Sequence, residues 1–250
     1  MIITQNEPIY IVDTVAILID KLRGIHEVVG CVVLSPSPFG KRETFIEKAL
    51  KIFKIFGLRF FAYYATKYIM SKLIKKHLGS ILEEKNIPQI NLEKSINDPS
   101  SLAEISKYEP DILLSIAGNE IFKKPLIELA PKGCLNLHTG LLPKYRGLMP
   151  TFWALKNKEK EVGVSVFYVD TGIDSGPIAV QRKVPVRNRV QSELIKETKK
   201  VGIECILEAL NNIETNSVVM HDNDDSHSTY YGFPTHDDVQ AFKKSGAKFF

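Results

Sequence analysis

The sequence lacks the features that mark most secreted proteins. It contains three cysteines in 250 residues, at positions 31, 134 and 205, and no C-x-x-C pair. An odd number of widely separated cysteines excludes a disulfide framework and favours buried thiols in a reduced, cytoplasmic protein. The N-terminus becomes polar by its fourth residue, so it has no apolar core of a signal peptide.

Long apolar runs and glycine-rich turns are also missing. Residues 43–84 come closest to an apolar run, but Lys51, Lys54, Arg59 and Lys67 interrupt them. Because a membrane-spanning helix needs ~20 predominantly apolar residues in a row, we exclude a transmembrane segment. The turn after the first predicted strand lacks the glycines of a dinucleotide-binding loop, which argues against NAD and FAD.

The composition is that of an ordinary globular protein. Hydrophobic residues make up 44% of the chain and charged residues 25%, which excludes a disordered or fibrous protein. The formal net charge of +4 arises from 33 basic and 29 acidic residues, a mixture that suits phosphorylated substrates without requiring nucleic acid. The length is enough for one sizeable domain with a modest extension.

Strand-like and helix-like segments alternate along the chain. Strands are predicted at 1–4, 26–35, 87–90, 111–117, 134–138, 162–169 and 178–186. Helices are predicted at 12–23, 99–107, 123–129, 150–156 and 192–212, and a polar tail follows from residue 215. This order predicts an α/β fold with a Rossmann-like, mostly parallel sheet flanked by helices. The last two strands are expected to form an antiparallel hairpin near the C-terminal part, before the short C-terminal tail.

The least typical segment is a helical insertion at about 43–84, which is dense in phenylalanine and tyrosine and rich in lysine. Its pattern is that of amphipathic helices. We expect these helices to pack on the sheet and to show a lysine face to water. A face that binds a membrane surface or a partner protein is the alternative.

The most informative stretch is the predicted strand at 134–138 with the loop that follows it. Side chains alternate along a strand, so Asn136 and His138 leave it on the same face. Gly140 and Pro143 end the regular structure directly afterwards. The pair therefore sits at a strand end, where an α/β sheet places its chemistry.

A third polar group, Asp174, lies in the loop of the predicted hairpin. A neutral histidine can take a proton from an amine, and an asparagine amide can donate to a carbonyl oxygen that becomes an oxyanion. An aspartate beside the histidine orients the imidazole and stabilises its charged form. Because the set has no activated serine or cysteine, it favours direct acyl transfer. From spacing alone, a histidine near a strand end is more often a structural hydrogen-bonding residue than a catalytic one, so that alternative stands beside the catalytic role of His138.

Two motifs in this region resemble those of a known enzyme family. The first is Asn-Leu-His-Thr-Gly-Leu-Leu-Pro-Lys-Tyr-Arg-Gly at 136–147, and the second is Thr-Gly-Ile-Asp-Ser-Gly-Pro at 171–177. Together they are similar to the signature of the formyltetrahydrofolate-dependent formyltransferases. That family includes glycinamide ribonucleotide transformylase, methionyl-tRNA formyltransferase and the nucleotide-sugar N-formyltransferases. The resemblance is strong at 110–185 and covers about 1–190 in organisation.

The resemblance implies a role for each motif residue. His138 would be the general base, Asn136 would polarise the formyl carbonyl, and Asp174 would tune His138. The pterin pocket of the donor, formyltetrahydrofolate, would be formed by Ser115, Ile116, Ala117, Gly118, Asp170, Thr171 and Gly172. The acceptor would contact Tyr145 and Arg146, the latter through a phosphate or carboxylate. The donor would be a co-substrate, and no metal is needed.

Several of these roles have a structural alternative. Ile116 and Ala117 could be core residues, Asp170 a turn-former and Arg146 a solvated surface residue. The cluster at 221–227 lacks the glycine and glutamate spacing of a calcium loop, so no metal is expected there. We expect the aromatic segment that begins at residue 230 to dock on the core rather than to stack on a base.

Departures from the family pattern narrow the choice of acceptor substrate. The purine-pathway enzyme has a glycine-rich phosphate loop after its first strand, where this chain has Gln-Asn-Glu-Pro at 5–8. The tRNA enzyme has a C-terminal β-barrel, for which the residues after 212 are too few. We therefore expect a small-molecule amine acceptor, best matched by a nucleotide-linked amino sugar. Methionyl-tRNA, glycinamide ribonucleotide and hydrolysis of formyltetrahydrofolate are the alternatives within this family.

The expected organisation is a formyltransferase catalytic domain at 1–213, which contains the helical insertion, and a C-terminal extension at 214–250. Because the inserted helices are rich in lysine, tRNA is retained as an alternative partner, although a disfavoured one. A homodimer is a further possibility that the sequence does not exclude. A non-catalytic folate- or membrane-associated binding protein is the alternative from another functional class.

Overall fold

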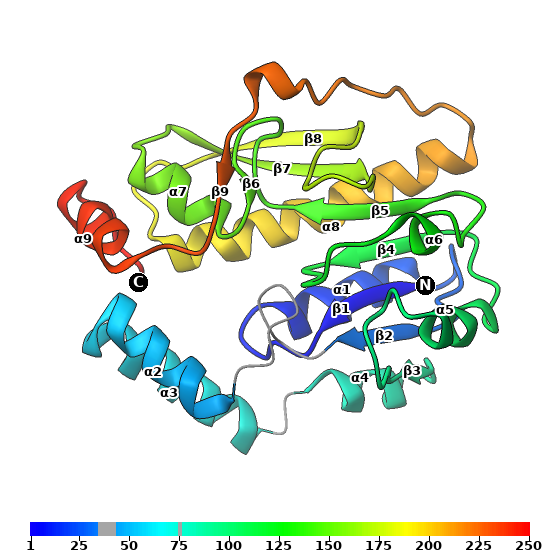
Figure 1. Cartoon of the computed structure of the whole chain (residues 1–250), viewed down its shortest axis with the longest axis horizontal. Helices are drawn as coiled ribbons and strands as arrows, with labels where there is room; N and C mark the ends of the chain where they lie inside the picture. Colours follow the sequence, from blue (N-terminus) through cyan, green and yellow to red (C-terminus); the bar gives the residue numbers. More distant parts are fainter. Residues whose placement is uncertain (35–43, 75–76) are drawn as a thin grey trace.

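The computed structural model describes residues 1–34, 44–74 and 77–250 and contains a seven-stranded sheet with helices on both faces (Figure 1). The strands lie in the order β3, β2, β1, β4, β5, β7, β8. Their bounds are β1 Ile2–Gln5, β2 Cys31–Leu34, β3 Gln89–Ile90, β4 Leu113–Ile116, β5 Cys134–His138, β7 Glu161–Tyr168 and β8 Ile178–Pro185. The first five in this order pair in parallel, and the last two are antiparallel. The predicted α/β fold with an antiparallel hairpin is confirmed.

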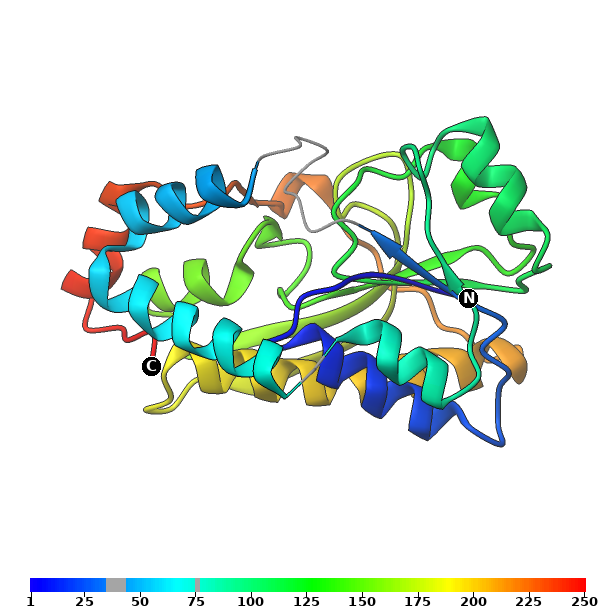
Figure 2. The same ribbon diagram turned by 90° about the horizontal axis from the view of Figure 1, so that it is seen from below.

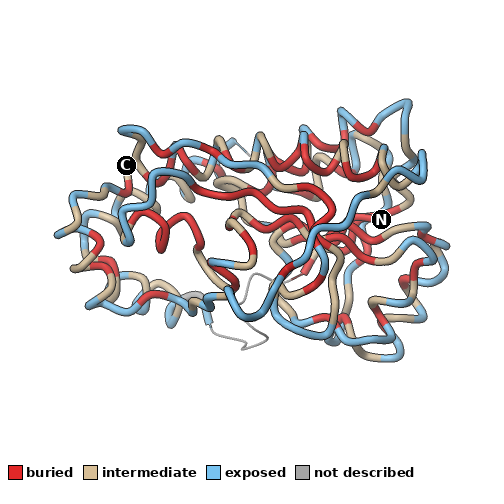
Figure 3. The backbone as a smooth tube through the Cα atoms, turned by 90° about the horizontal axis from the view of Figure 1, so that it is seen from above, coloured by how far each residue is buried: buried red, intermediate tan, exposed pale blue. Residues whose placement is uncertain are grey.

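Two layers of helices cover the sheet. Helices α1 (Ile11–Leu22) and α8 (Gln191–Glu214) lie on one face, and α5 (Pro99–Ser106) and α6 (Lys124–Ile127) lie on the other (Figure 2). All four residues of β4 are buried, as expected for a parallel strand covered on both sides. Buried residues run through the centre of the molecule, while the outer sides of the helices are exposed (Figure 3).

The described residues of the insertion form the helices α2 (Phe45–Phe56), α3 (Leu58–Leu73) and α4 (Leu78–Glu84). Helices α2 and α3 pack on each other and extend away from the sheet toward the C-terminal end of the chain (Figures 1 and 2). The ring of Phe60 packs on that of Phe249 at 4.9 Å. The expectation that the insertion packs on the sheet is wrong for α2 and α3, because the C-terminal segment provides their apolar partner.

Large apolar side chains are exposed on and just after α2 and α3. They are Ile46, Leu50, Phe53, Leu58, Ile69, Met70, Leu73 and Ile74. A partner-binding face on these helices stays a prediction, and this set marks where it would lie. Within the described ranges, none of the helices combines the length and apolarity needed to cross a bilayer.

The three cysteines are free and buried, as expected. Cys31 and Cys134 lie in the sheet, and Cys205 lies in α8. Burial raises the pKa of the Cys31 thiol to about 12. It is therefore a packing residue and not a thiolate at neutral pH.

The chain after α8 returns across the hairpin and docks beside the loop that follows β5. A short strand, β9 (Tyr230–Tyr231), pairs in parallel with β6 (Arg146–Gly147). The ring of Tyr231 stacks on Tyr145 and Trp153, with centroids 5.4 and 4.7 Å away. The expected docking of this aromatic segment on the core is confirmed.

The chain continues into α9 (His236–Lys244), a helix that the sequence reading of a polar tail missed. Thr235 begins it with a capping box that includes Asp238. Val239 and Phe242 are fully buried, three residues apart on one face. The capping box and the spacing of the two apolar residues are sequence signals of a helix. They were missed because the helix is short and most of its other residues are polar.

Replacing Phe242 by alanine tests whether the C-terminal segment belongs to the core. Phe242 stacks on Phe152 and Phe249, with ring centroids 4.8 and 4.4 Å away. We expect the free energy of unfolding to fall by about 3–5 kcal/mol, measured by urea titration in one cooperative transition. The control Lys243→Ala, at an exposed position of α9, should change it by less than about 0.5 kcal/mol. Wild-type stability of Phe242→Ala would mark residues 214–250 as an independent appendage.

Candidate active site

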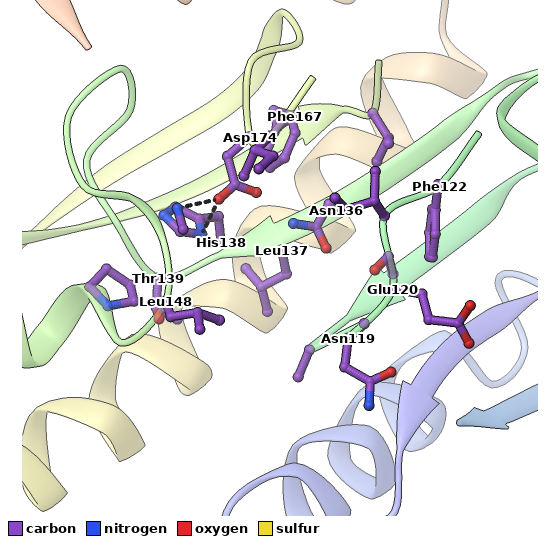
Figure 4. Close-up of a pocket in the computed structure, with 18 of the residues that line it drawn as sticks. Asn119, Glu120, Phe122, Asn136, Leu137, His138, Thr139, Leu148, Phe167 and Asp174 are labelled. Carbon is purple, nitrogen blue, oxygen red and sulfur yellow. Dashed lines mark hydrogen bonds and ion pairs between the residues drawn. The ribbon is translucent and has the colours of Figure 1, made fainter. Parts of the chain in front are cut away.

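A cavity of about 480 Å³ opens at the carboxyl edge of the sheet (Figure 4). Its walls come from the ends of β1, β4 and β5, from the loop between β7 and β8, from the start of α7 (Pro150–Lys156) and from α8. This is the edge at which parallel α/β sheets bind their ligands. The polar side chains that line it are Gln5, Ser115, Asn119, Glu120, Asn136, His138, Thr139, Asp174 and Lys199.

Asn136 and His138 both line the cavity, as their alternation along β5 predicts. Strand β5 is bonded to β4 on one side and to β7 on the other, which fixes the direction of both side chains. Asn136 lies between His138 and the turn at Glu120 (Figure 4). Its side-chain amide makes no hydrogen bond to a described residue and is available to a ligand.

The imidazole of His138 is held between two oxygens. Its Nε2 lies 2.8 Å from the carbonyl oxygen of Tyr145, and its Nδ1 lies 3.5 Å from Oδ2 of Asp174. Because a carbonyl oxygen can only accept, we assign the proton of the neutral ring to Nε2 and the lone pair to Nδ1. Nδ1 can therefore take up a proton, and the carboxylate of Asp174 then faces the resulting cation.

The loop that carries Asp174 is fixed by its own hydrogen bonds. Oδ2 of Asp174 accepts a hydrogen bond from the backbone N–H of Gly147 at 2.8 Å. Asp174 has φ of 49°, in the left-handed region that a short polar residue tolerates. Oδ1 of Asp170 accepts from the N–H of Gly172 at 3.0 Å and from the hydroxyl of Ser175 at 2.7 Å. The loop thus presents the Asp174 carboxylate in one position.

Asn223 ties the C-terminal segment to this loop, and sequence reasoning missed it. Its Nδ2 donates to the carbonyl oxygens of Asp174 and Gly176, each at 2.9 Å. Nη2 of Arg146 donates to the side-chain and backbone oxygens of Asn223, each at 2.9 Å, and Nη1 donates to Asp225 at 2.6 Å. A lone asparagine in a polar stretch carries no local signal, so only the folded chain reveals this role.

The structure places Tyr145 and Arg146 outside the set of residues that line the cavity. Arg146 is 7% exposed, and its guanidinium is bonded to Asn223 and Asp225, which corrects the expectation that it meets the acceptor. Tyr145 donates its hydroxyl hydrogen to Glu159 at 2.7 Å, and burial raises its pKa. It borders a second hollow of about 390 Å³. Both residues shape the loop after β5 and do not reach the cavity.

Four of the seven residues expected at the donor line the cavity: Ser115, Ala117, Gly118 and Gly172. Ile116 is fully buried in the core, which agrees with its structural alternative. The carboxylate of Asp170 holds the hairpin loop, also as its alternative predicts. Thr171 lies in that loop outside the cavity lining. The donor role of the four lining residues stays a prediction.

Sequence reasoning also missed the apolar wall of the cavity and one of its cations. Phe122, Leu148, Phe167 and Phe233 line it, together with Lys199 from α8. These residues come from five separate segments, so no motif could have grouped them. An apolar wall excludes water and strengthens the electrostatic interactions of the polar groups inside.

The fold and the cavity define an α/β protein with an asparagine, a histidine and an aspartate assembled at the carboxyl edge of its sheet. A family model described as "Formyl transferase" matches residues 65–210, more than half of the chain. The protein belongs to this formyl transferase family.

Individual relatives are consistent with that family. Methionyl-tRNA formyltransferase from Kosmotoga olearia is 35% identical over 160 residues, 64% of this chain and 51% of the relative. The chain spans about half the length of the curated relatives it matches.

Two solved structures share the fold. One is the N-formyltransferase from Helicobacter canadensis in complex with folinic acid and dTDP-3-aminofucose, with a TM-score of 0.60 and 17% identity over 98% of this chain and 79% of that one. The other is a sugar N-formyltransferase from a Shewanella species, with a TM-score of 0.58 and 17% identity over 98% and 86%. At this identity the likeness shows the fold alone.

Replacing Asn223 by alanine tests the link between the C-terminal segment and the Asp174 loop. The change leaves two carbonyl oxygens and part of the Arg146 guanidinium without partners, so we expect a loss of about 1–3 kcal/mol in the free energy of unfolding. Urea titration measures it. Asn211→Ala, at an exposed position of α8, is the matched control and should change the value by less than about 0.5 kcal/mol. Equal stability of the two variants would contradict the link.

Proposed function

We propose that this protein transfers a formyl group from formyltetrahydrofolate to a primary amine of a small acceptor. The observation that carries the proposal is the convergence of the Asn136 amide, Nδ1 of His138 and the Asp174 carboxylate on one cavity. These groups can activate an amine and stabilise an oxyanion without a covalent intermediate. Membership of the formyl transferase family supports the same reaction.

Each of the three residues has a defined task in the proposed reaction. The amine nitrogen attacks the formyl carbon, and the amide N–H of Asn136 donates to the carbonyl oxygen as it becomes negative. Nδ1 of His138 takes the proton that the amine loses, and Asp174 stabilises the imidazolium from 3.5 Å. His138 then returns the proton to the folate nitrogen as the bond between that nitrogen and the formyl carbon breaks. The products are the N-formylated acceptor and tetrahydrofolate.

We assign the donor to the side of the cavity formed by the end of β4 and the hairpin loop. Ser115, Ala117 and Gly118 line the cavity from the end of β4, and Gly172 lines it from the hairpin loop. A Cβ on Gly118 would come within 2.7 Å of Oγ of Ser115, so the glycine keeps this wall open. Backbone amides and carbonyls at the strand end can read the edge of a pterin. The Helicobacter canadensis neighbour, which was solved with folinic acid, supports a folate-type donor for this fold.

We infer that the acceptor is a nucleotide-linked amino sugar. The structural neighbour solved with dTDP-3-aminofucose supports this class. The absence of a glycine-rich loop at 5–8 argues against glycinamide ribonucleotide. Methionyl-tRNA is the second candidate, because the relative from Kosmotoga olearia carries that name and because α2 and α3 are rich in lysine. Hydrolysis of the donor without an acceptor is the third.

An assay of His138 and Asn136 variants tests the proposed chemistry. With formyltetrahydrofolate and a panel of amino-sugar nucleotides, the wild-type protein should yield an N-formylated product detected by mass spectrometry. His138→Ala should slow the transfer by about 10²–10⁴-fold because the base is lost. Asn136→Ala should slow it by about 10²–10³-fold because the oxyanion loses its donor. His221→Ala removes an exposed histidine outside the cavity and should keep wild-type activity.

Other outcomes of the same assay identify the alternatives. Formylation of methionyl-tRNA, but of none of the sugar nucleotides, selects the second candidate. Formate release that no amine stimulates identifies a hydrolase. If Asn136→Ala and Asp174→Ala change nothing beyond stability, the protein is a non-catalytic folate-binding protein and the proposed reaction is wrong.

A further inference from the structure

Helices α2 and α3 carry apolar side chains on two sides. One side packs on the C-terminal segment, where the rings of Phe56 and Phe60 lie 5.8 and 4.9 Å from the ring of Phe249. The other side is exposed to solvent. The two helices lie at the outer edge of the molecule, extended away from the sheet (Figures 1 and 2). Packing within the chain therefore accounts for only one of the two apolar sides.

The exposed apolar residues of α2 form a stripe along the helix. They are Ile46, Leu50 and Phe53, which are 69%, 52% and 44% exposed. Spacings of four and three residues place their side chains within an arc of about 60° on one face. An aligned stripe of large exposed hydrophobic residues is a mark of an interaction surface, whereas single ones are ordinary.

Helix α3 repeats the pattern. Leu58, Ile69 and Leu73 are each more than half exposed. Ile69 follows Leu58 by eleven residues, close to three turns, and Leu73 follows one turn later, so all three share one face. Ala62 lies on the same face and is also exposed. This face therefore offers a second apolar stripe, on the helix that packs directly against α2.

Basic side chains flank both stripes. Lys54 follows Phe53 at the edge of the α2 stripe, and the helical period places Arg59 and Lys72 on opposite sides of the α3 stripe. Residues 44–74 contain one acidic residue, Glu47, whereas the whole chain has 29 acidic residues for 33 basic ones. The basic residues of this segment are Lys48, Lys51, Lys54, Arg59, Lys67 and Lys72. The excess of positive charge is thus concentrated on the helices that expose the apolar stripes.

This combination fits an anionic lipid surface better than other partners. Helices that lie in a membrane interface bury an apolar stripe and place lysine and arginine against anionic head groups. A second copy of the chain would bring two strongly basic segments together, and like charges oppose such an interface. A nucleic acid would use the basic residues but not the aliphatic stripes, because it is bound through phosphates, base edges and base stacking.

We propose that α2 and α3 dock the protein on an anionic lipid surface. The apolar stripes would enter the boundary between head groups and acyl chains, and the flanking basic residues would face lipid phosphates. The docking helices are joined to the candidate active site by direct packing. The ring of Phe56 lies 6.0 Å from the ring of Phe233, which lines the cavity. The proposal is independent of the proposed function, because lipid binding requires no catalysis.

The test is co-sedimentation of the full chain with lipid vesicles at low ionic strength. One set of vesicles contains phosphatidylcholine with about 30% phosphatidylglycerol, and the other contains phosphatidylcholine alone. The wild type should bind the anionic vesicles about tenfold or more tightly than the neutral ones, because its basic residues are attracted to anionic head groups. Added salt should weaken the binding by screening these charges.

Replacing the α3 stripe tests whether binding uses this face. The triple variant Leu58→Gln, Ile69→Gln, Leu73→Gln should bind anionic vesicles about tenfold or more weakly, because less apolar area enters the lipid. All three residues are exposed, so the thermal unfolding midpoint should stay close to that of the wild type. The matched control replaces three exposed apolar residues elsewhere and should bind like the wild type. It is Ile25→Gln, Val219→Gln, Met220→Gln.

A second triple variant tests the charges. Lys54→Gln, Arg59→Gln, Lys72→Gln should weaken binding to anionic vesicles by about tenfold or more and leave binding to neutral vesicles unchanged. Its matched control removes three exposed lysines around α6, away from α2 and α3 (Figure 1), and should bind like the wild type. It is Lys123→Gln, Lys124→Gln, Lys132→Gln.

Four results would overturn the inference. They are no binding of the wild type to anionic vesicles, equal binding to anionic and neutral vesicles, and equal binding of either triple variant and its control. Two measurements then identify another occupant of the same face. A dimer in sedimentation velocity that the apolar variant abolishes would make the face an interface between two copies. Binding of tRNA that the charge variant abolishes, without binding to vesicles, would make it a nucleic-acid surface.

Discussion

The hydrogen bond between Nε2 of His138 and the carbonyl oxygen of Tyr145 is the interaction on which the candidate site depends. It sets the tautomer, so the lone pair of Nδ1 is the one available for a proton. The carbonyl keeps its place only if the loop after β5 is fixed. The hydroxyl of Ser165 donates to the carbonyl of Gly140 at 2.8 Å, and the N–H of Tyr145 donates to the hydroxyl of Thr229 at 2.9 Å. The chemistry of one imidazole is therefore controlled by a strand and by the C-terminal segment together.

The C-terminal segment is part of the scaffold of the site. Asn223 bonds the backbone of the Asp174 loop, and Arg146 holds Asn223 in turn. Further along, Phe242 packs its ring on Phe152 of α7, the helix that starts at the edge of the cavity. Hydrogen bonds and core packing thus connect the C-terminal segment to the Asp174 loop and to the helix that borders the cavity. Because buried polar groups are expensive to leave unpaired, these contacts order the loop as well as the segment.

The charged groups around the cavity differ in whether they have a partner within the protein. The carboxylate of Glu7 occupies the N-terminus of α1 and leaves that helix end without capacity for another anion. The carboxylate of Asp174 is shared between His138 and the N–H of Gly147. Lys199 is the charged group of the lining that lacks such an internal partner within the described residues. The polar groups around His138 are thus held by the protein in the arrangement that the proposed proton transfer requires, and the ammonium group of Lys199 is held by none of the described residues.

Much of this architecture could be predicted from local patterns, because strand alternation and the order of strands and helices are short-range properties. The sheet, the shared face of Asn136 and His138, and the motif around Asp174 follow from neighbouring residues in the sequence. The burial of Arg146, the packing of α2 and α3, and the place of Lys199 were decided by the tertiary structure. Each depends on a partner far away in the chain, and a side chain's sequence neighbours do not say which distant surface will cover it. By itself, the sequence determined the strand that carries Asn136 and His138. Only the fold decided which polar side chains are bonded within the protein, as Arg146 is, and which face the cavity, as Lys199 does.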